Sequence, residues 1–229
     1  MTPKSDASAR RCRREDSETL RVHATKFRHW LWLAFFLIGA GYFGSWVWHK
    51  AAGLNLSADD LGEWVKFLPA WRSGQLPVMR ELFYLPIWLT SIGLGLMAGH
   101  IRAWPWKLVV LAVSLLLVLT PLPKYPELLS AYREPEFMPT FWATMVALLL
   151  SVIFTFCGSQ LSDRVEAILW IVIGVSAALF APWMFGRAMP DIDRLYHYSI
   201  GWGIAAVVIG GVLAALIGGT MLIRRNRAS

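Results

Sequence analysis

The sequence has only two cysteines, Cys12 and Cys157, in 229 residues. One lies in a basic N-terminal tail and the other at the end of an apolar segment, so no disulfide framework is expected. The chain also lacks HExxH and CxxC spacings, a glycine-rich phosphate loop and a GxSG motif with a partnering histidine. We therefore expect no catalytic residue, no metal and no cofactor.

The long apolar segments lack Asp, Glu, Lys, Arg and His in their middle. Carriers coupled to protons or ions usually keep an ionisable group near the centre of the membrane, so this absence argues against that class. The polar groups that do occur there are Ser and Thr hydroxyls. We expect these to bond to neighbouring helices or to their own backbone.

The sequence is rich in apolar residues. It is 56% hydrophobic, contains 13 tryptophans and has a mean hydropathy of +0.49, which is typical of a multi-pass membrane protein. We predict an all-α fold, a bundle of six transmembrane helices. The predicted spans are Trp30–Trp48, Leu82–Gly99, Trp104–Leu122, Phe141–Cys157, Ala167–Phe185 and Tyr198–Ile223.

The distribution of Lys and Arg predicts the orientation. Basic residues gather in the tail at 1–29, in the short connections on the same side and in the C-terminal segment at 224–229. By the positive-inside rule both termini are cytosolic, in a plasma membrane of the bacterial inner-membrane type. The tail, which we expect to be partly disordered, then serves to orient the chain rather than to bind nucleic acid. The tryptophans fall near the predicted membrane interfaces, as expected for this class.

Three longer connections, about 49–81, 123–140 and 186–197, face outward in this topology. The first contains an amphipathic pattern that predicts a helix lying in the headgroup layer, with its tryptophan face toward the lipid. Ser57 is its expected N-cap and Pro69 its end, and Asp59 and Asp60 fall in its first turn. The apolar face consists of Leu61, Trp64, Val65 and Leu68.

The last predicted span carries small residues at every fourth position: Ala206, Gly210, Ala214 and Gly218. Such a face allows another helix to pack closely against it. We expect that helix to belong to the same bundle. A partner membrane subunit that binds through the last helix is the alternative.

Charged residues near the outer span ends are the candidate recognition site. In the simpler interpretation these residues form ion pairs between the loops. In the functional interpretation they form an outward-facing concave site that binds an anionic lipid headgroup or solute. The candidate ligand-binding residues are Arg80, Glu81, Arg133, Arg187, Asp193, Arg194 and His197.

Three functions fit these features. The first is a non-catalytic membrane subunit or small-solute transport component with an outward-facing recognition surface. The second is an outward-facing enzyme that acts on lipid-linked or envelope substrates through carboxylates such as Glu81 or Asp193. The third is an assembly or anchoring factor that acts through the last helix. The first is favoured because the chain has neither a catalytic motif nor a charge inside a span.

Overall fold

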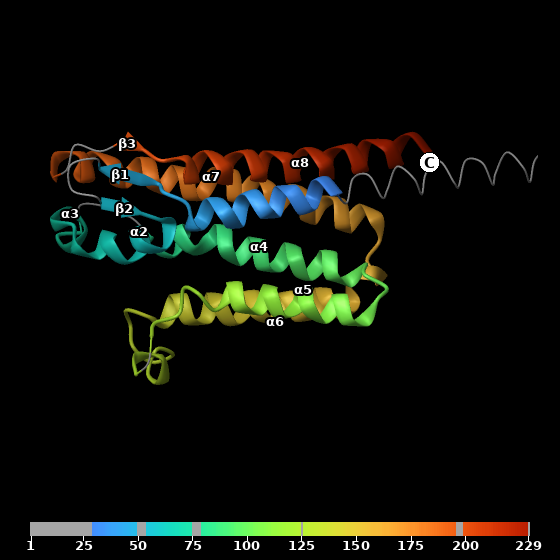
Figure 1. Ribbon diagram of the computed structural model, residues 1–229, viewed down its shortest axis with the longest axis horizontal. Coiled ribbons are helices and arrows are strands. Elements are labelled where there is room, and N and C mark those ends of the chain that lie inside the picture. The colour runs from blue at the N-terminus through green and yellow to red at the C-terminus, as the bar shows by residue number, and fades with distance from the viewer. Residues whose placement is uncertain (1–28, 50–53, 75–78, 125, 196–198, 229) are drawn as a thin grey trace, which may run out of the picture.

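The computed structural model describes residues 29–49, 54–74, 79–124, 126–195 and 199–228 (Figure 1). The protein is 79% helical, which confirms the all-α prediction at the level of fold class. Its principal helices are His29–Phe43, α4 (Glu81–Gly99), α5 (Trp104–Val118), α6 (Met138–Cys157), α7 (Asp163–Leu195) and α8 (Trp202–Ala228). The shorter elements are β1 (Val47–His49), β2 (Leu54–Leu56), α2 (Ala58–Trp64), η1 (Val65–Phe67), α3 (Pro69–Arg72), η2 (Glu127–Leu129), η3 (Gly158–Gln160) and β3 (Ser199–Ile200).

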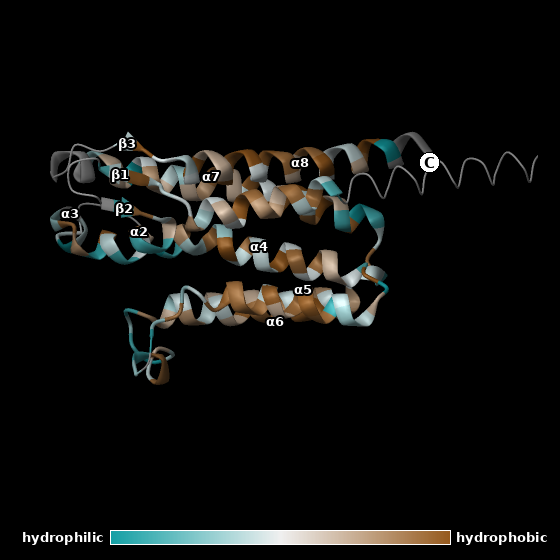
Figure 2. Cartoon of the chain, viewed as in Figure 1, coloured by the Kyte–Doolittle hydropathy of each residue, from teal (hydrophilic) through white to brown (hydrophobic). Residues whose placement is uncertain are grey.

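Helix α4 is the centre of the bundle. The His29–Phe43 helix, α7 and α8 lie on one side of it and α5 and α6 on the other (Figure 1). In α4, 83% of the span is buried inside the protein, against 28% in α6 and 39% in both α7 and α8. The outer helices therefore each expose an apolar face, and Figure 2 shows hydrophobic residues along the whole middle of the bundle.

Four helices in the described ranges are long and apolar enough to cross a membrane: α4, α6 with η3, α7 and α8. This supports a membrane location. The His29–Phe43 helix and α5 are shorter, and at about 1.5 Å per residue each covers less than the roughly 30 Å of a hydrocarbon layer. The first predicted span was placed to Trp48, but the chain leaves the helix at Gly44 and enters β1. The third was placed to Leu122, but its helix ends at Val118, shortly before Pro121 and Pro123.

A small sheet, which the sequence patterns do not predict, joins three distant segments. Its strand order is β2-β1-β3 and both pairs are antiparallel, with Val47 opposite Leu56 on one side and Ile200 on the other. The last span was predicted to begin at Tyr198, but α8 begins at Trp202 because Ser199 and Ile200 belong to β3. The sheet thus ties the end of the first helix to the start of the last.

Helix α7 continues through most of the segment that was predicted as the third outer connection at 186–197. It runs to Leu195 with Pro182 and Pro190 inside it. An unbroken buried face explains the continuation, because Ala181, Phe185 and Ala188 recur at helical spacing and are all buried. At about 1.5 Å per residue this helix is roughly 50 Å long, so it extends well beyond a hydrocarbon layer.

A helix begins where the sequence predicts one, but its length and surroundings differ from the prediction: α2 ends at Trp64, and the 3-10 turn η1 carries the chain to Phe67. Ser57 caps α2 in a capping box with Asp60, as the sequence pattern indicates. The apolar residues Leu61, Val65 and Leu68 are almost completely buried among the protein's own residues. The face that was predicted to meet lipid therefore packs against the bundle, and α4 is the helix that it contacts.

The small-residue face of α8 packs against helices of the same chain. A Cβ on Gly210 would lie 2.6 Å from the backbone oxygen of Ala34, and one on Gly218 would lie 2.6 Å from that of Ala167. Ala206 and Ala214 are also buried. Packing within the bundle therefore explains the small residues on this face of α8. Any partner that binds α8 must use its other side, where large hydrophobic residues such as Leu216 are exposed.

Hydroxyl groups connect the three helices α4, α5 and α6 inside the bundle. Ser91 Oγ lies 2.8 Å from both Ser114 Oγ and Ser151 Oγ, and all three side chains are fully buried. Thr155 bonds to the carbonyl of Ser151 on its own helix. These hydroxyls bond to neighbouring helices or to their own backbone, as the sequence led us to expect.

The bundle has two different ends. The end that carries the three strands, α2 and α3 is called the sheet end, and the opposite end, where the His29–Phe43 helix begins and α8 finishes, is called the tail end (Figure 1). Both termini of the described bundle therefore lie at one end. Hydrophilic residues concentrate at the two ends in Figure 2, with the apolar band between them.

Candidate functional site

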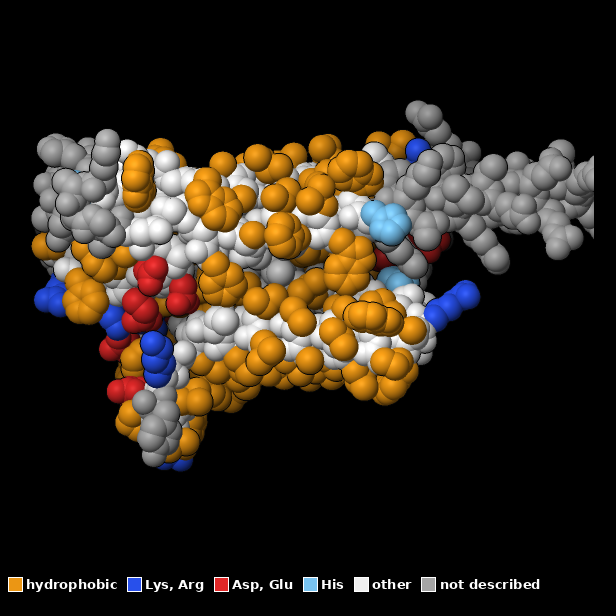
Figure 3. Space-filling model, in the orientation of Figure 1, with side chains coloured by type: hydrophobic (Ala, Val, Ile, Leu, Met, Phe, Trp, Pro, Cys, Tyr) orange, Lys and Arg blue, Asp and Glu red, His pale blue; other side chains and the backbone are white. Residues whose placement is uncertain are grey.

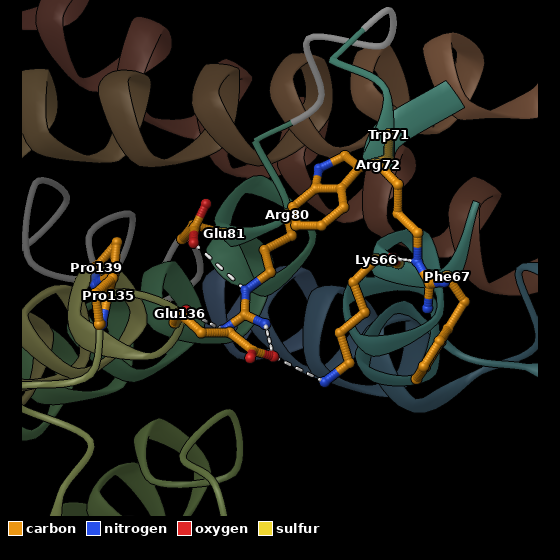
Figure 4. A pocket seen from close by; sticks show the side chains of 9 residues that line it. All are labelled: Lys66, Phe67, Trp71, Arg72, Arg80, Glu81, Pro135, Glu136 and Pro139. Carbon is orange, nitrogen blue, oxygen red and sulfur yellow. Dashed lines mark hydrogen bonds and ion pairs between the residues drawn. The ribbon is translucent and has the colours of Figure 1, made fainter. Parts of the chain in front are cut away.

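A cavity of about 680 Å³ lies at the sheet end, beside a cluster of charged side chains (Figures 3 and 4). Three segments far apart in the sequence form its wall: the stretch from η1 to α3, the first turn of α4, and the segment that leads into α6. The lining residues are Lys66, Phe67, Trp71, Arg72, Arg80, Glu81, Pro135, Glu136 and Pro139.

Arg80 is the central cation of this site. Its side chain is only 4% exposed, and its Nη2 donates to the backbone oxygen of Glu136 at 2.7 Å. Its Nε lies 3.5 Å from Glu81 Oε1. Its Nη1 makes no hydrogen bond to any described residue, although Glu136 Oε1 is 3.6 Å and Glu63 Oε1 3.9 Å away. Arg80 therefore keeps an unused donor that a small movement or an acceptor group can satisfy.

Lys66 links the carboxylates of two segments. Its Nζ lies 2.6 Å from Glu63 Oε2 and 3.1 Å from Glu136 Oε1. It also lies 5.9 Å from the centre of the Phe137 ring, and the Arg80 guanidinium lies 5.5 Å from the same ring. One aromatic ring thus supports both cations.

The network holds its charges in the ionised form. Burial by itself raises the pKa of Glu63, but hydrogen bonds from Lys66 and Tyr84 and the positive charges of Lys66 and Arg80 outweigh it, so the pKa of Glu63 is lowered. Burial tends to lower the pKa of Lys66, and the hydrogen bonds to Glu63 and Glu136 reverse this, so the pKa of Lys66 is raised. These groups are therefore suited to electrostatic recognition rather than to proton transfer near neutral pH.

Arg72 differs from the other two lining cations. Its Nε donates to the backbone oxygen of Lys66 at 3.3 Å, and its guanidinium lies 5.8 Å from the Phe67 ring centre. In the ranges that the structure describes, no carboxylate forms an ion pair with Arg72. Lys66 and Arg80 are compensated by carboxylates, so Arg72 supplies uncompensated positive charge to the cavity wall.

Two tyrosines fix α2 to the bundle behind the cavity. Tyr84 of α4 donates to Glu63 at 2.9 Å, and Tyr42 of the first helix donates to Asp59 at 2.8 Å. The Tyr84 ring also fills the space beside Gly62, where an added Cβ would lie 2.6 Å from it. Burial is the main cause that raises the pKa of Asp59 above its ordinary value.

The structure brings together only part of the predicted recognition set. Arg80 and Glu81 line the cavity. Arg133 is exposed and stacks on Tyr132, and Arg187 is exposed and stacks on Trp183 of α7; neither lines the cavity. Asp193 and Arg194 belong to the last turns of α7, where only the backbone is described, and His197 lies outside the described residues. Whether any of these residues binds a ligand stays a prediction.

The sequence reasoning missed Glu63, Lys66 and Glu136 as members of one cluster. Glu63 and Lys66 are three residues apart on one turn, and this spacing was interpreted only as the polar side of an amphipathic helix. Glu136 lies 70 positions from Lys66, so no local pattern connects them. Two local signals were present: the helical spacing of Glu63 and Lys66, and the prolines around Glu136 that stiffen its segment.

Comparisons with known proteins found no match for this chain among protein-family models, curated proteins or solved structures. Across the described ranges, no group of three or more His, Cys, Asp or Glu side chains is placed to hold a metal ion.

Proposed function

We propose that the protein is a non-catalytic membrane component that recognises a small anionic solute in the cavity at its sheet end. In this proposal all six apolar helices are embedded in the plasma membrane. The short His29–Phe43 helix and α5 complete their crossings with adjoining non-helical residues. The tail end faces the cytosol and the sheet end faces outward.

The orientation is supported by two independent features. The described bundle begins and finishes at the same end, as an even number of crossings requires (Figure 1). The basic segments of the sequence adjoin that end, since residues 1–28 precede the first helix and Arg224, Arg225 and Arg227 lie at the end of the last. The positive-inside rule then assigns the tail end to the cytosol.

The single observation that carries the functional proposal is the charge balance of the cavity wall. Lys66 and Arg80 are paired with carboxylates, whereas Arg72 has no carboxylate partner in the described ranges and Arg80 keeps one donor unused. A carboxylate or phosphate group would complete both. Phe67, Trp71 and Pro139 supply apolar surface for the remainder of the solute.

Recognition is favoured over acid–base catalysis at this site. A general acid or base needs a pKa close to the working pH, but the pKa of Glu63 is lowered and that of Lys66 is raised. Asp59, whose pKa shifts in the direction that a general acid needs, does not line the cavity. A subunit of a larger transport system and a solute sensor are both compatible with this role.

The test is a binding screen with the full chain in detergent or proteoliposomes. The panel comprises small carboxylates, phosphate monoesters, sugars and amines, and the readout is the thermal midpoint together with uptake into the vesicles. A bound ligand at about a hundred times its Kd raises the midpoint by several degrees. We expect a carboxylate or phosphate ester to do so, and Arg72→Ala to abolish the effect.

Arg133→Ala is the matched control, because Arg133 also stacks on an aromatic ring at the sheet end but does not line the cavity. It should leave the ligand response unchanged. The proposal is wrong if no anionic member of the panel raises the midpoint, or if Arg72→Ala and Arg133→Ala respond alike.

A further inference from the structure

A second cavity, of about 430 Å³, lies at the tail end. The turn between α4 and α5, the first turns of α5 and the short helix η3 form its wall. The lining residues are Gly99, His100, Ile101, Arg102, Lys107 and Ser159. None of these carries a carboxylate, so the wall presents a guanidinium, an ammonium, an imidazole and a hydroxyl group.

The two cations of this cavity are not neutralised by the described part of the protein. No hydrogen bond or ion pair joins Arg102 or Lys107 to a carboxylate in the described ranges. The nearby acidic residue, Glu166, is buried and is directed at other groups: its Oε1 lies 3.1 Å from His100 Nε2 and accepts from Trp170 Nε1 at 3.3 Å. Glu166 does not line the cavity. The site is thus complementary to an anion.

The position of the cavity indicates that the anion belongs to a lipid. Trp104 and Trp106 lie at the start of α5, next to the cavity residues, and both are exposed, as tryptophans at a membrane interface are. From this point α5 exposes Leu108, Val109 and Leu116. A molecule whose phosphate enters the cavity can therefore lay acyl chains along α5.

We propose that the tail-end cavity binds the phosphate of an anionic phospholipid from the adjoining leaflet. Arg102 and Lys107 contact the phosphate oxygens, Ser159 and His100 lie at the inner wall, and the two tryptophans flank the headgroup. Basic pockets between membrane helices commonly take such headgroups. The inference needs only membrane embedding and is independent of the solute proposed for the sheet end.

The experiment compares two lipids on the full-length protein. The chain is purified in a neutral detergent and titrated with phosphatidylglycerol or phosphatidylcholine, and retention of lipid is measured by native mass spectrometry. We expect phosphatidylglycerol to bind at least tenfold more tightly. Each basic residue near a membrane surface accounts for about a fivefold change in affinity. Arg102→Ala and Lys107→Ala should therefore each reduce the preference about fivefold, and the double variant should nearly abolish it.

Arg164→Ala is the matched control. Arg164 is an exposed arginine of the first turn of α7, near the same end, and does not line the cavity, so its replacement should leave the preference unchanged. Equal binding of the two lipids by the wild-type chain would overturn the proposal without any variant. Equal loss in Arg164→Ala would also overturn it, because that result indicates general surface charge.

A competition arm separates a lipid from a free phosphate. Inorganic phosphate and glycerol phosphate at millimolar concentration should fail to displace phosphatidylglycerol, because they lack chains to contact α5. Displacement at that concentration would show that the cavity takes a soluble phosphate and would refute the lipid assignment. Failure of the sheet-end ligand screen has no bearing on either outcome.

Discussion

The two ends of the bundle differ in how their cationic side chains are paired with carboxylates. At the sheet end Lys66 and Arg80 are surrounded by carboxylates from three segments, and Arg80 is buried. At the tail end Arg102 and Lys107 line a cavity without any carboxylate in its wall. The comparison teaches that the paired charges of Lys66 and Arg80 hold the sheet end together and leave mainly Arg72 for a ligand, whereas both cations of the tail-end cavity are available to one. The predictions below test this difference.

Replacement of Arg80 should give the largest loss of stability. Arg80→Met takes the cation away from Glu81, leaves Glu136 with Lys66 alone, and removes the hydrogen bond that holds the segment before α6. We expect the free energy of unfolding in mixed micelles to fall by about 2 kcal/mol or more. Arg133→Met, which removes only an exposed stacking contact, should cost at most about 1 kcal/mol. Equal losses would show that the cluster adds no stability.

Two glycines test the packing of the two ends. A Cβ on Gly201, beside the sheet, would lie 2.1 Å from the backbone oxygen of Ser45, whereas one on Gly219, toward the tail end of α8, would meet nothing within 4 Å. Gly201→Ala should lower the free energy of unfolding by about 1–3 kcal/mol. Gly219→Ala should raise it by up to about 1 kcal/mol, because alanine favours a helix. A Gly201→Ala protein as stable as the wild type would contradict the close approach of Gly201 to the backbone of Ser45.

The pH dependence of stability should report the sheet-end network. Because the folded-state pKa of Glu63 is lowered from 4.5, its contribution is present above that value and is lost as the pH falls through the lowered pKa. Glu63→Gln should therefore be less stable than the wild type at pH 7, and the two should converge as the pH falls below the lowered pKa of Glu63. A stability difference that does not shrink as the solution is acidified below pH 4.5 would show that the charge of Glu63 is not its cause. Lys66 affects stability at high pH. Because its folded-state pKa is raised, its contribution to the free energy of unfolding is lost only above pH 10.5.

The tail-end cations should have the smallest effect on stability. Arg102→Ala and Lys107→Ala remove no described ion pair, so each should change the free energy of unfolding in neutral detergent by less than about 0.5 kcal/mol. Unfolding in detergent with and without phosphatidylglycerol measures this. A loss above 1 kcal/mol without the lipid would show that these cations hold the fold, which would remove the contrast between the two ends.

The sequence predicted the local elements well because their causes are local. Apolar runs located the six principal helices, four of which are long enough to cross a membrane, and Ser57 with Asp60 located the start of α2. The faces of these helices were harder to assign. Leu61 and Val65 have the same pattern whether a helix lies on lipid or on α4, so only the structure decides between the two.

Long-range contacts were beyond the reach of the sequence patterns. Strand β3 is two residues long and pairs with a strand about 150 positions earlier. No alternation of apolar residues and no turn motif in the sequence therefore predicts it. The fifth span was predicted to end at Phe185, but Ala188 and Met189 are buried beyond it and the helix continues to Leu195. Of the predicted recognition residues, Arg80 lines the sheet-end cavity whereas Arg133 and Arg187 do not, because proximity to a span end does not determine the direction of a side chain.

The central claim is that the sheet end faces outward and the tail end faces the cytosol. It is tested most directly by cysteine labelling in intact cells, with Cys12 and Cys157 replaced by serine. Single cysteines are placed at Arg133 for the sheet end and at Arg164 for the tail end, both exposed. A membrane-impermeant maleimide should label Arg133→Cys in intact cells and Arg164→Cys only after permeabilisation. The reverse pattern, or labelling of both in intact cells, would contradict the account.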